Sequence, residues 1–92
     1  MRIVLEINDP HYVVKRIGFD IKDIGDVETY CQEHNWQLHD IMRIHLNTRK
    51  SNIILYDHES INGKIETWEE FSQVALQKLG AFMLRLIKIG LQ

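Results

Sequence analysis

The segment from residue 81 to residue 91 restricts the fold of this chain more than any other feature of its sequence. It holds eight apolar residues, and Arg85 and Lys88 are its only charged ones. As a helix or as a strand, such a segment is apolar on more than one side, so one side has to pack against the domain's own core or against another chain. A small domain has little capacity to enclose it, which favours self-association. The residues expected to carry this contact are Phe82, Leu84, Leu86 and Ile87.

The secondary structure of this segment is ambiguous from the sequence. Gly80 stands at a place where helices commonly end, and continuing a helix through a glycine costs about 1 kcal/mol relative to alanine. Gly80 and Gly90 also bracket the apolar run, whereas Met83 and the leucines favour a helix. We predict a last strand over residues 82–89, with a continued helix as the alternative.

The N-terminal half predicts a hairpin followed by a helix. Residues 2–7 and 12–17 are rich in isoleucine and valine, as strands are, and the run 8–11 between them holds turn residues and a proline. Asp26 is a suitable N-cap for a helix. After it, apolar residues recur at the three-and-four spacing of one helix face. These residues are Val27, Tyr30, Cys31 and His34.

A second hairpin and a second helix follow. Residues 37–46 alternate between apolar and polar side chains, residues 53–56 are apolar, and the polar run between them predicts a turn. Asn62–Gly63 predicts a short additional ribbon, because both residues tolerate positive φ. Thr67 and Glu70 form a capping box, which predicts the start of the last helix.

From residue 12 onward, the predicted order is strand, helix, strand, strand, helix, strand. This order resembles the ferredoxin-like βαββαβ arrangement, here with an extra N-terminal strand. We therefore expect one α+β domain of 92 residues, with an antiparallel sheet that carries both helices on one face. Because this fold hosts many unrelated functions, the resemblance implies nothing about activity.

Composition narrows the classes of function. The formal net charge of -2 gives the chain no overall attraction for phosphate backbones. No stretch reaches the roughly 20 apolar residues that span a bilayer, and Glu6 and Asp9 do not suit a signal peptide. Cys31 is the only cysteine, so no intramolecular disulfide is possible. We expect a cytoplasmic protein.

The chain lacks recognisable catalytic patterns. Cys31 precedes His34 by three residues, but a thiol in the middle of a helix, beside acidic and apolar residues, does not suit a nucleophile. No residue spacing suits a zinc site or a phosphate-binding loop, so we expect no catalysis, no cofactor and no metal. One alternative stays open, because a four-residue hairpin loop would bring Asp40, Asp57 and Glu59 together as the Mg²⁺ ligands of a nuclease.

The same hairpin register predicts a surface for a partner protein. It sets Arg43 opposite Tyr56, and His45 opposite Ile54, on an uncovered sheet face. Arginine and tyrosine are favoured interface anchors, so Arg43 and Tyr56 would form the centre, flanked by His39 and His45. We therefore predict a small non-catalytic interaction domain, a regulator, inhibitor or assembly factor, that binds another protein and itself.

Nucleic-acid binding is the alternative function. RNA-recognition modules bind bases on an open sheet face that carries aromatic rings, and Arg49 and Lys50 at the hairpin tip would add positive charge to such a face. Residues 71–92 also contain no acidic residue. Against this alternative, the chain lacks the glycine and aromatic signature of those modules.

Overall fold

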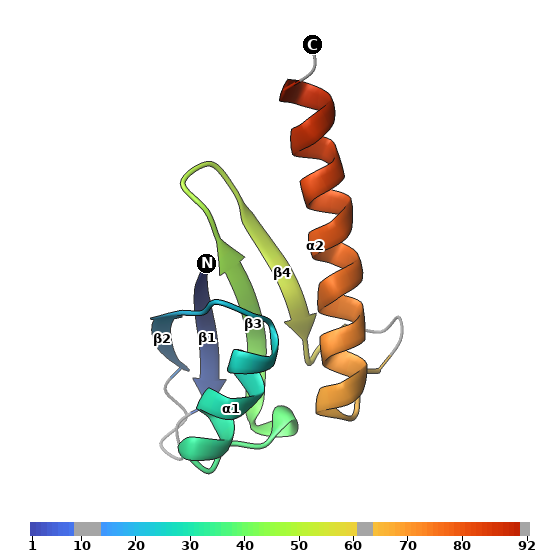
Figure 1. Cartoon of the computed structure of the whole chain (residues 1–92). Coiled ribbons are helices and arrows are strands. Elements are labelled where there is room, and N and C mark those ends of the chain that lie inside the picture. The colour runs from blue at the N-terminus through green and yellow to red at the C-terminus, as the bar shows by residue number, and fades with distance from the viewer. Residues whose placement is uncertain (9–13, 61–63, 91–92) are drawn as a thin grey trace.

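The computed structural model of this chain describes residues 1–8, 14–60 and 64–90, and of residues 8 and 81–90 the backbone alone. In these ranges four antiparallel strands form one sheet accompanied by two α-helices, which is an α+β fold (Figure 1). The elements are β1 (Arg2–Asn8), β2 (Val14–Asp20), α1 (Gly25–Glu33), the short 3-10 helix η1 (Leu38–Asp40), β3 (Ile41–Asn47), β4 (Asn52–Asp57) and α2 (Trp68–Gly90).

The sheet consists of the two predicted hairpins, joined side by side. Its strand order is β2-β1-β3-β4, so the first strand of each hairpin lies in the centre. Leu5 of β1 pairs with Ile17 of β2 on one side and with Ile44 of β3 on the other. Because successive residues of a strand point to opposite faces, this register gathers the isoleucines and leucines on one face of the sheet.

One hydrophobic core contains residues from the strands and from both helices. Its members from the central strands include Ile3, Leu5, Ile44 and Leu46, and its members from the helices include Val27, Cys31, Phe71 and Ala75. Fully burying one large aliphatic or aromatic side chain contributes about 1.5–3 kcal/mol. The core therefore holds α1 and the first half of α2 against the strands.

The first helix begins two residues before the predicted position. Its N-cap is Ile24, and Asp26 lies in the first turn instead, where its carboxylate accepts the backbone N–H groups of Lys22 and Asp23 at 2.9 and 3.1 Å. These hydrogen bonds lower the pKa of Asp26. The helix ends at Glu33, and shortly after it Asn35 adopts a φ of 59°, a left-handed conformation that asparagine tolerates.

The last helix is longer than the sequence predicts. α2 runs without a break from Trp68 to Gly90, so the strand predicted over residues 82–89 is wrong. The described elements end on a helix, and the ferredoxin-like order is not confirmed. The helix continues because the methionine and leucines after Gly80 are strong helix formers, which outweighs the cost of one glycine. The first strands of the two hairpins, β1 and β3, also pair directly, so no additional strand lies between the hairpins.

The start of α2 follows the predicted capping box in part. The Glu70 backbone N–H donates to Thr67 Oγ1 at 3.1 Å, as predicted. The Glu70 carboxylate, however, accepts the backbone N–H of Glu66 at 3.2 Å instead of that of Thr67. The ribbon predicted at Asn62–Gly63 lies outside the described residues.

Candidate functional site

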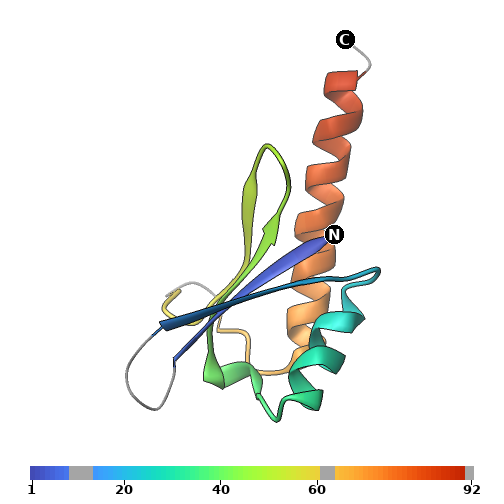
Figure 2. The same ribbon diagram turned by 90° about the vertical axis from the view of Figure 1, so that its left-hand side faces the viewer.

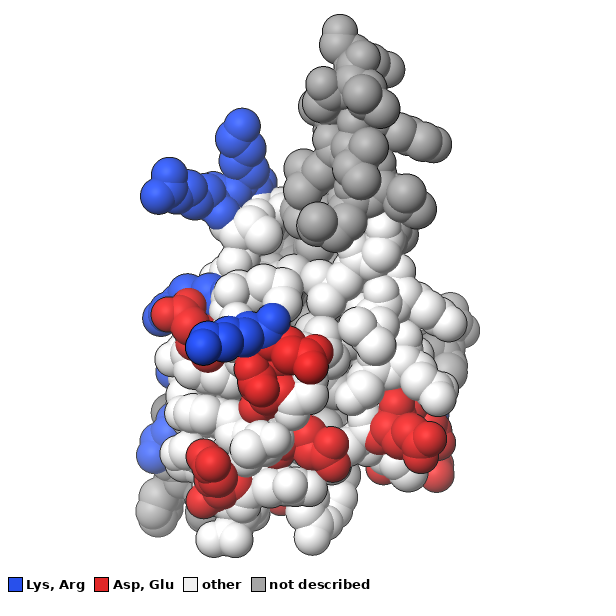
Figure 3. Space-filling view, viewed as in Figure 1, with Lys and Arg blue, Asp and Glu red and all other residues white. Residues whose placement is uncertain are grey.

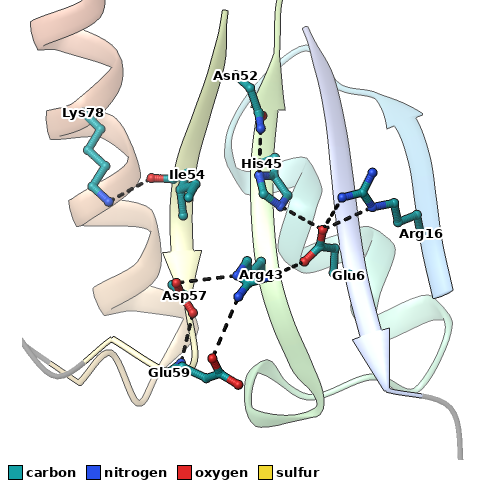
Figure 4. Close-up of polar contacts among 9 residues, drawn as sticks. All are labelled: Glu6, Arg16, Arg43, His45, Asn52, Ile54, Asp57, Glu59 and Lys78. Carbon is teal, nitrogen blue, oxygen red and sulfur yellow. Dashed lines mark hydrogen bonds and ion pairs between the residues drawn. The ribbon is translucent and has the colours of Figure 1, made fainter. Parts of the chain in front are cut away.

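Four charged side chains form a row across all four strands of the sheet (Figure 4). We call Arg16, Glu6, Arg43 and Asp57 the charge row; they come from β2, β1, β3 and β4 in that order, and each is paired in register with the next. Arg16 Nη2 lies 2.8 Å from Glu6 Oε1, and Arg43 Nη1 lies 3.0 Å from Glu6 Oε2. The signs of the charges therefore alternate from one edge of the sheet to the other.

The carboxylate of Glu6 is the buried centre of the charge row. Its side chain is 5% exposed, whereas the side chains of Arg16 and Arg43 are 74% and 34% exposed. Burial alone would raise the pKa of Glu6, but hydrogen bonds from Arg43 and Arg16, together with nearby positive charge, hold it below the ordinary value of 4.5. Glu6 is therefore ionised at neutral pH, and the two arginines compensate its charge.

His45 extends the network along β3. It pairs with Ile54 as predicted, but its side chain is buried. Its Nδ1 lies 3.2 Å from the side-chain amide nitrogen of Asn52, which donates that hydrogen bond. Nε2 lies 3.4 Å from Glu6 Oε1 and has no hydrogen-bond partner among the described residues. His45 therefore lies beside Glu6 in the buried part of the network, and its side chain is not exposed to a partner.

Arg43 and Tyr56, which were predicted to share one face of the sheet, lie on opposite faces. Arg43 pairs with Asp57, one residue further along β4 than predicted, and Tyr56 is 5% exposed as a member of the core. An irregularity in the β3–β4 pairing makes Leu55 an extra residue, and one extra residue shifts the register beyond it by one position. The predicted pairing of Arg43 with Tyr56 is therefore wrong.

Arg43 is surrounded by carboxylates. Besides Glu6, its guanidinium contacts Asp57 at 3.6 Å and Glu59 at 3.8 Å. The hydrogen bond to Glu6, followed by the charge of Asp57, raises the pKa of Arg43. With Glu59 included, two arginines face three carboxylates, so this face carries no surplus of positive charge for a phosphate backbone.

The acidic residues predicted for a Mg²⁺ site do not form one. Asp57 and Glu59 contact Arg43, whereas Asp40 accepts the backbone N–H of Gln37, the N-cap of η1, at 2.9 Å. Among the described residues, no group of three or more His, Cys, Asp or Glu side chains could hold a metal ion.

A pocket of about 370 Å³ lies at the end of β4. Its lining includes His39, Tyr56, His58, Lys64 and Glu66. The Tyr56 hydroxyl lies 3.1 Å from His58 Nδ1, and burial, followed by the charge of Asp57, raises the pKa of Tyr56. The phenol therefore stays protonated at neutral pH. Two residues predicted to bind a partner, His39 and Tyr56, thus line this pocket and not the face of the charge row.

The other predicted site residues lie apart from the charge row. Arg49 and Lys50 are exposed in the turn between β3 and β4, where Figure 3 shows basic side chains projecting from the surface. Cys31 is fully buried in the core, and burial raises its pKa to about 12. His34 donates its Nδ1–H to the Tyr30 carbonyl at 2.8 Å and does not assist the thiol.

Helix α2 offers a second candidate surface. Figures 1 and 2 show that its last turns run beyond the sheet. Near its middle, Lys78 Nζ donates to the Ile54 carbonyl of β4 at 2.9 Å. Ala75 is fully buried, but the next residue, Leu76, is 57% exposed. The residues predicted for self-association, Phe82, Leu84, Leu86 and Ile87, lie in the later half of α2, and their side chains are outside the described part of the structure.

Comparisons with models of known families, with curated proteins and with solved structures gave no match for this chain. Across the described residues, no helix combines the length and the apolar character that crossing a membrane requires. The choice of function therefore depends on the surfaces of the sheet and of α2.

Proposed function

We propose that this chain is a non-catalytic protein–protein interaction domain that associates with a second copy of itself through α2. The observation that carries the proposal is the contrast between the two halves of this helix. The first half contributes Phe71 and Ala75 to the core. The second half belongs to the apolar segment 81–91 and runs beyond the sheet (Figure 2).

The apolar surface of the second half is wider than one core contact requires. A surface helix needs an apolar stripe of about 100° to pack on its own domain. At 100° per residue, the apolar residues of 81–91 are spread over more than half of the circumference, and Arg85 and Lys88 occupy the remainder. The apolar residues beyond the core contact form a second stripe along α2. This stripe begins at exposed Leu76, and in the sequence Met83 and Ile87 continue it. A second copy would remove this surface from water, which stabilises the pair by about 25 cal/mol per Å² of apolar area.

The oligomeric state tests the proposal directly. Sedimentation velocity over a range of low to high micromolar concentration is expected to show a species of about twice the 10.9 kDa mass of one chain. Leu76→Glu should abolish this species. Val14→Glu is the matched control, because Val14 is also an exposed apolar residue, 48% against 57%, but lies on β2. A monomer at all concentrations, or equal effects of both substitutions, would contradict the proposal.

We further propose that α1 and α2 cover the same face of the sheet and leave the face of the charge row to a different protein, which this chain regulates, inhibits or helps to assemble. The core shared by Val27 of α1 and Phe71 of α2 supports this arrangement. On the opposite face, Arg16 is 74% exposed and Glu59 is 69% exposed, so a partner has charged groups to recognise.

Affinity capture from the native host tests this second surface. Glu59→Lys reverses an exposed charge beside Arg43, whereas Glu33→Lys makes the same change on α1. A protein retained by the wild-type chain and by Glu33→Lys, but lost with Glu59→Lys, supports the face of the charge row. Retention by all three chains would refute it.

Nucleic-acid binding has less support, because the carboxylates of the charge row compensate Arg43. It would depend on Arg49 and Lys50. A filter-binding titration separates the two functions, since only nucleic-acid binding is expected to weaken steeply as the salt concentration rises.

A further inference from the structure

We infer that self-association is an antiparallel pairing of two α2 helices that cross at Gly80. The inference rests on the proposed function, because it specifies the geometry of the same contact. In this pairing, a second copy of this chain covers the exposed side of α2. Three features of α2 support it, namely the position of Gly80, the apolar residues around it and the distribution of charge.

The packing of the described residues gives no reason for a glycine at position 80. It lies inside α2, where glycine is the poorest helix former after proline. It is exposed, and a Cβ built on it would meet no atom within 4 Å apart from its chain neighbours and the adjacent backbone of α2. No neighbour in the described structure therefore requires the side chain to be missing. A glycine on an exposed helix does allow another backbone to approach closely, which a larger residue would prevent.

The residues around Gly80 continue the exposed apolar stripe. Leu76 lies four residues before Gly80 and is 57% exposed. In the sequence, Met83 and Ile87 follow Gly80 by three and seven residues, which are the spacings of one helix face. Gly80 is thus the narrow point of an apolar stripe, with larger side chains on both sides of it to surround a crossing helix.

The charges of α2 select the antiparallel direction. Glu69 and Glu70 occupy its first turn, whereas residues 71–92 contain no acidic residue and carry Lys78, Arg85 and Lys88. A parallel pair in register would set like charges against each other. An antiparallel pair sets the basic half of each helix beside the acidic first turn of the other, and a two-fold axis at Gly80 makes both contacts at once. With this axis, Lys88 of one copy comes within one helical turn of Glu70 of the second copy.

Cysteine cross-linking tests the direction of the helices. The two-fold axis places Gln73 of one copy opposite Ile87 of the second copy. Under mild oxidation, a mixture of Gln73→Cys and Ile87→Cys chains is expected to form the mixed disulfide, because a disulfide requires Cα atoms about 4.4–6.8 Å apart. In a parallel pair, each variant alone would form its own symmetric disulfide instead. The wild-type chain is the control, since Cys31 is fully buried.

Substitutions of Gly80 test the crossing point. Gly80→Leu is expected to weaken the dimer about tenfold or more, which corresponds to about 1.4 kcal/mol, although it adds apolar surface. Gly80→Ala is the matched control, since alanine also improves helix propensity but adds a single methyl group. It should change the dissociation constant by less than Gly80→Leu does. An unchanged or tighter dimer with Gly80→Leu would overturn the crossing at Gly80.

The outcomes separate this inference from the proposed function. A dimer in sedimentation that gives symmetric disulfides at residue 73 or 87, or no disulfide at all, overturns the antiparallel crossing and leaves self-association in place. A monomer at every concentration overturns both. A dimer with the mixed disulfide and with weakening by Gly80→Leu supports both.

Discussion

Replacing Glu6 by glutamine tests whether the charge row stabilises the fold. Glutamine keeps the size of the side chain and one carbonyl oxygen, but it removes the negative charge that faces Arg16, Arg43 and His45. It also replaces one acceptor oxygen by an NH₂ donor, and both arginines are donors only. At least one arginine therefore loses its hydrogen bond to residue 6, and its charge is no longer compensated there.

The size of the effect follows from burial. Glu6 accepts three hydrogen bonds from its two arginines, and a hydrogen bond to a charged group contributes about 1.5–3 kcal/mol. The arginine side chains are 74% and 34% exposed, so water replaces part of what they lose. We expect the free energy of unfolding to fall by about 2–3 kcal/mol. For a domain of this size, that lowers the melting temperature by about 10–20 °C.

Glu59→Gln is the matched control for this substitution. It makes the same chemical change beside the same partner, since Glu59 lies 3.8 Å from Arg43, but the Glu59 side chain is 69% exposed. Exposed ion pairs contribute little to stability. Thermal and urea unfolding, followed by circular dichroism at neutral pH, should therefore show a large loss for Glu6→Gln and almost none for Glu59→Gln.

The pH dependence provides the second measurement. Because the folded-state pKa of Glu6 is lowered from 4.5, its contribution is fully present above the unfolded pKa and is lost as the pH falls through the folded pKa. The stability gap between the wild-type chain and Glu6→Gln should therefore close in acid. Equal losses from the two glutamine variants at neutral pH, or a gap that stays constant into acid, would refute the reasoning.

Three further substitutions or reactions test other parts of the fold. Phe71→Ala should lower the free energy of unfolding by about 3–5 kcal/mol in urea titrations, because Phe71 is fully buried in the core; a loss as small as that of exposed Val14→Ala would contradict this. Thr67→Ala should cost about 1 kcal/mol in thermal melts, since it removes the acceptor of the Glu70 N–H. Cys31, whose pKa burial raises to about 12, should react with iodoacetamide at neutral pH only after unfolding, and rapid reaction of the folded chain would show that the thiol is accessible.

The sequence predicts the two hairpins better than it predicts the pairing between them or the length of α2. β1 and β2, and likewise β3 and β4, lie close in the chain and carry the residue types of strands, so local pattern is sufficient for them. The pairing of β1 with β3 joins distant segments, so no local pattern predicts it. The continuation of α2 through Gly80 depends on the helix propensity of the residues that follow. A glycine at this position is also typical of a helix end, so the sequence alone does not predict the continuation.

The candidate site is less predictable from the sequence than the fold. Strand alternation predicts that Arg43 and His45 share one face of the sheet. The extra residue Leu55 moves Tyr56 into the core, and a single sequence gives no clear signal for such a bulge. No pattern in the sequence predicts Glu6 as a residue of the site. Its partners Arg16 and Arg43 are 10 and 37 residues away, so only the assembled sheet brings them together.

The charge row also explains why self-association is assigned to α2 and not to the sheet face. A dimer across the charge row would take Arg16 and Arg43 out of water, yet the carboxylate of Glu6 already serves both of them and has no further charge to offer. Removing a charge from water without a new partner opposes association. A different protein that brings its own carboxylates to Arg16 avoids this cost, whereas an identical copy presents the same alternating charges and has to find a register in which they complement one another. The apolar stripe of α2 carries no such penalty, so we expect a second copy to bind there and to leave the charge row exposed.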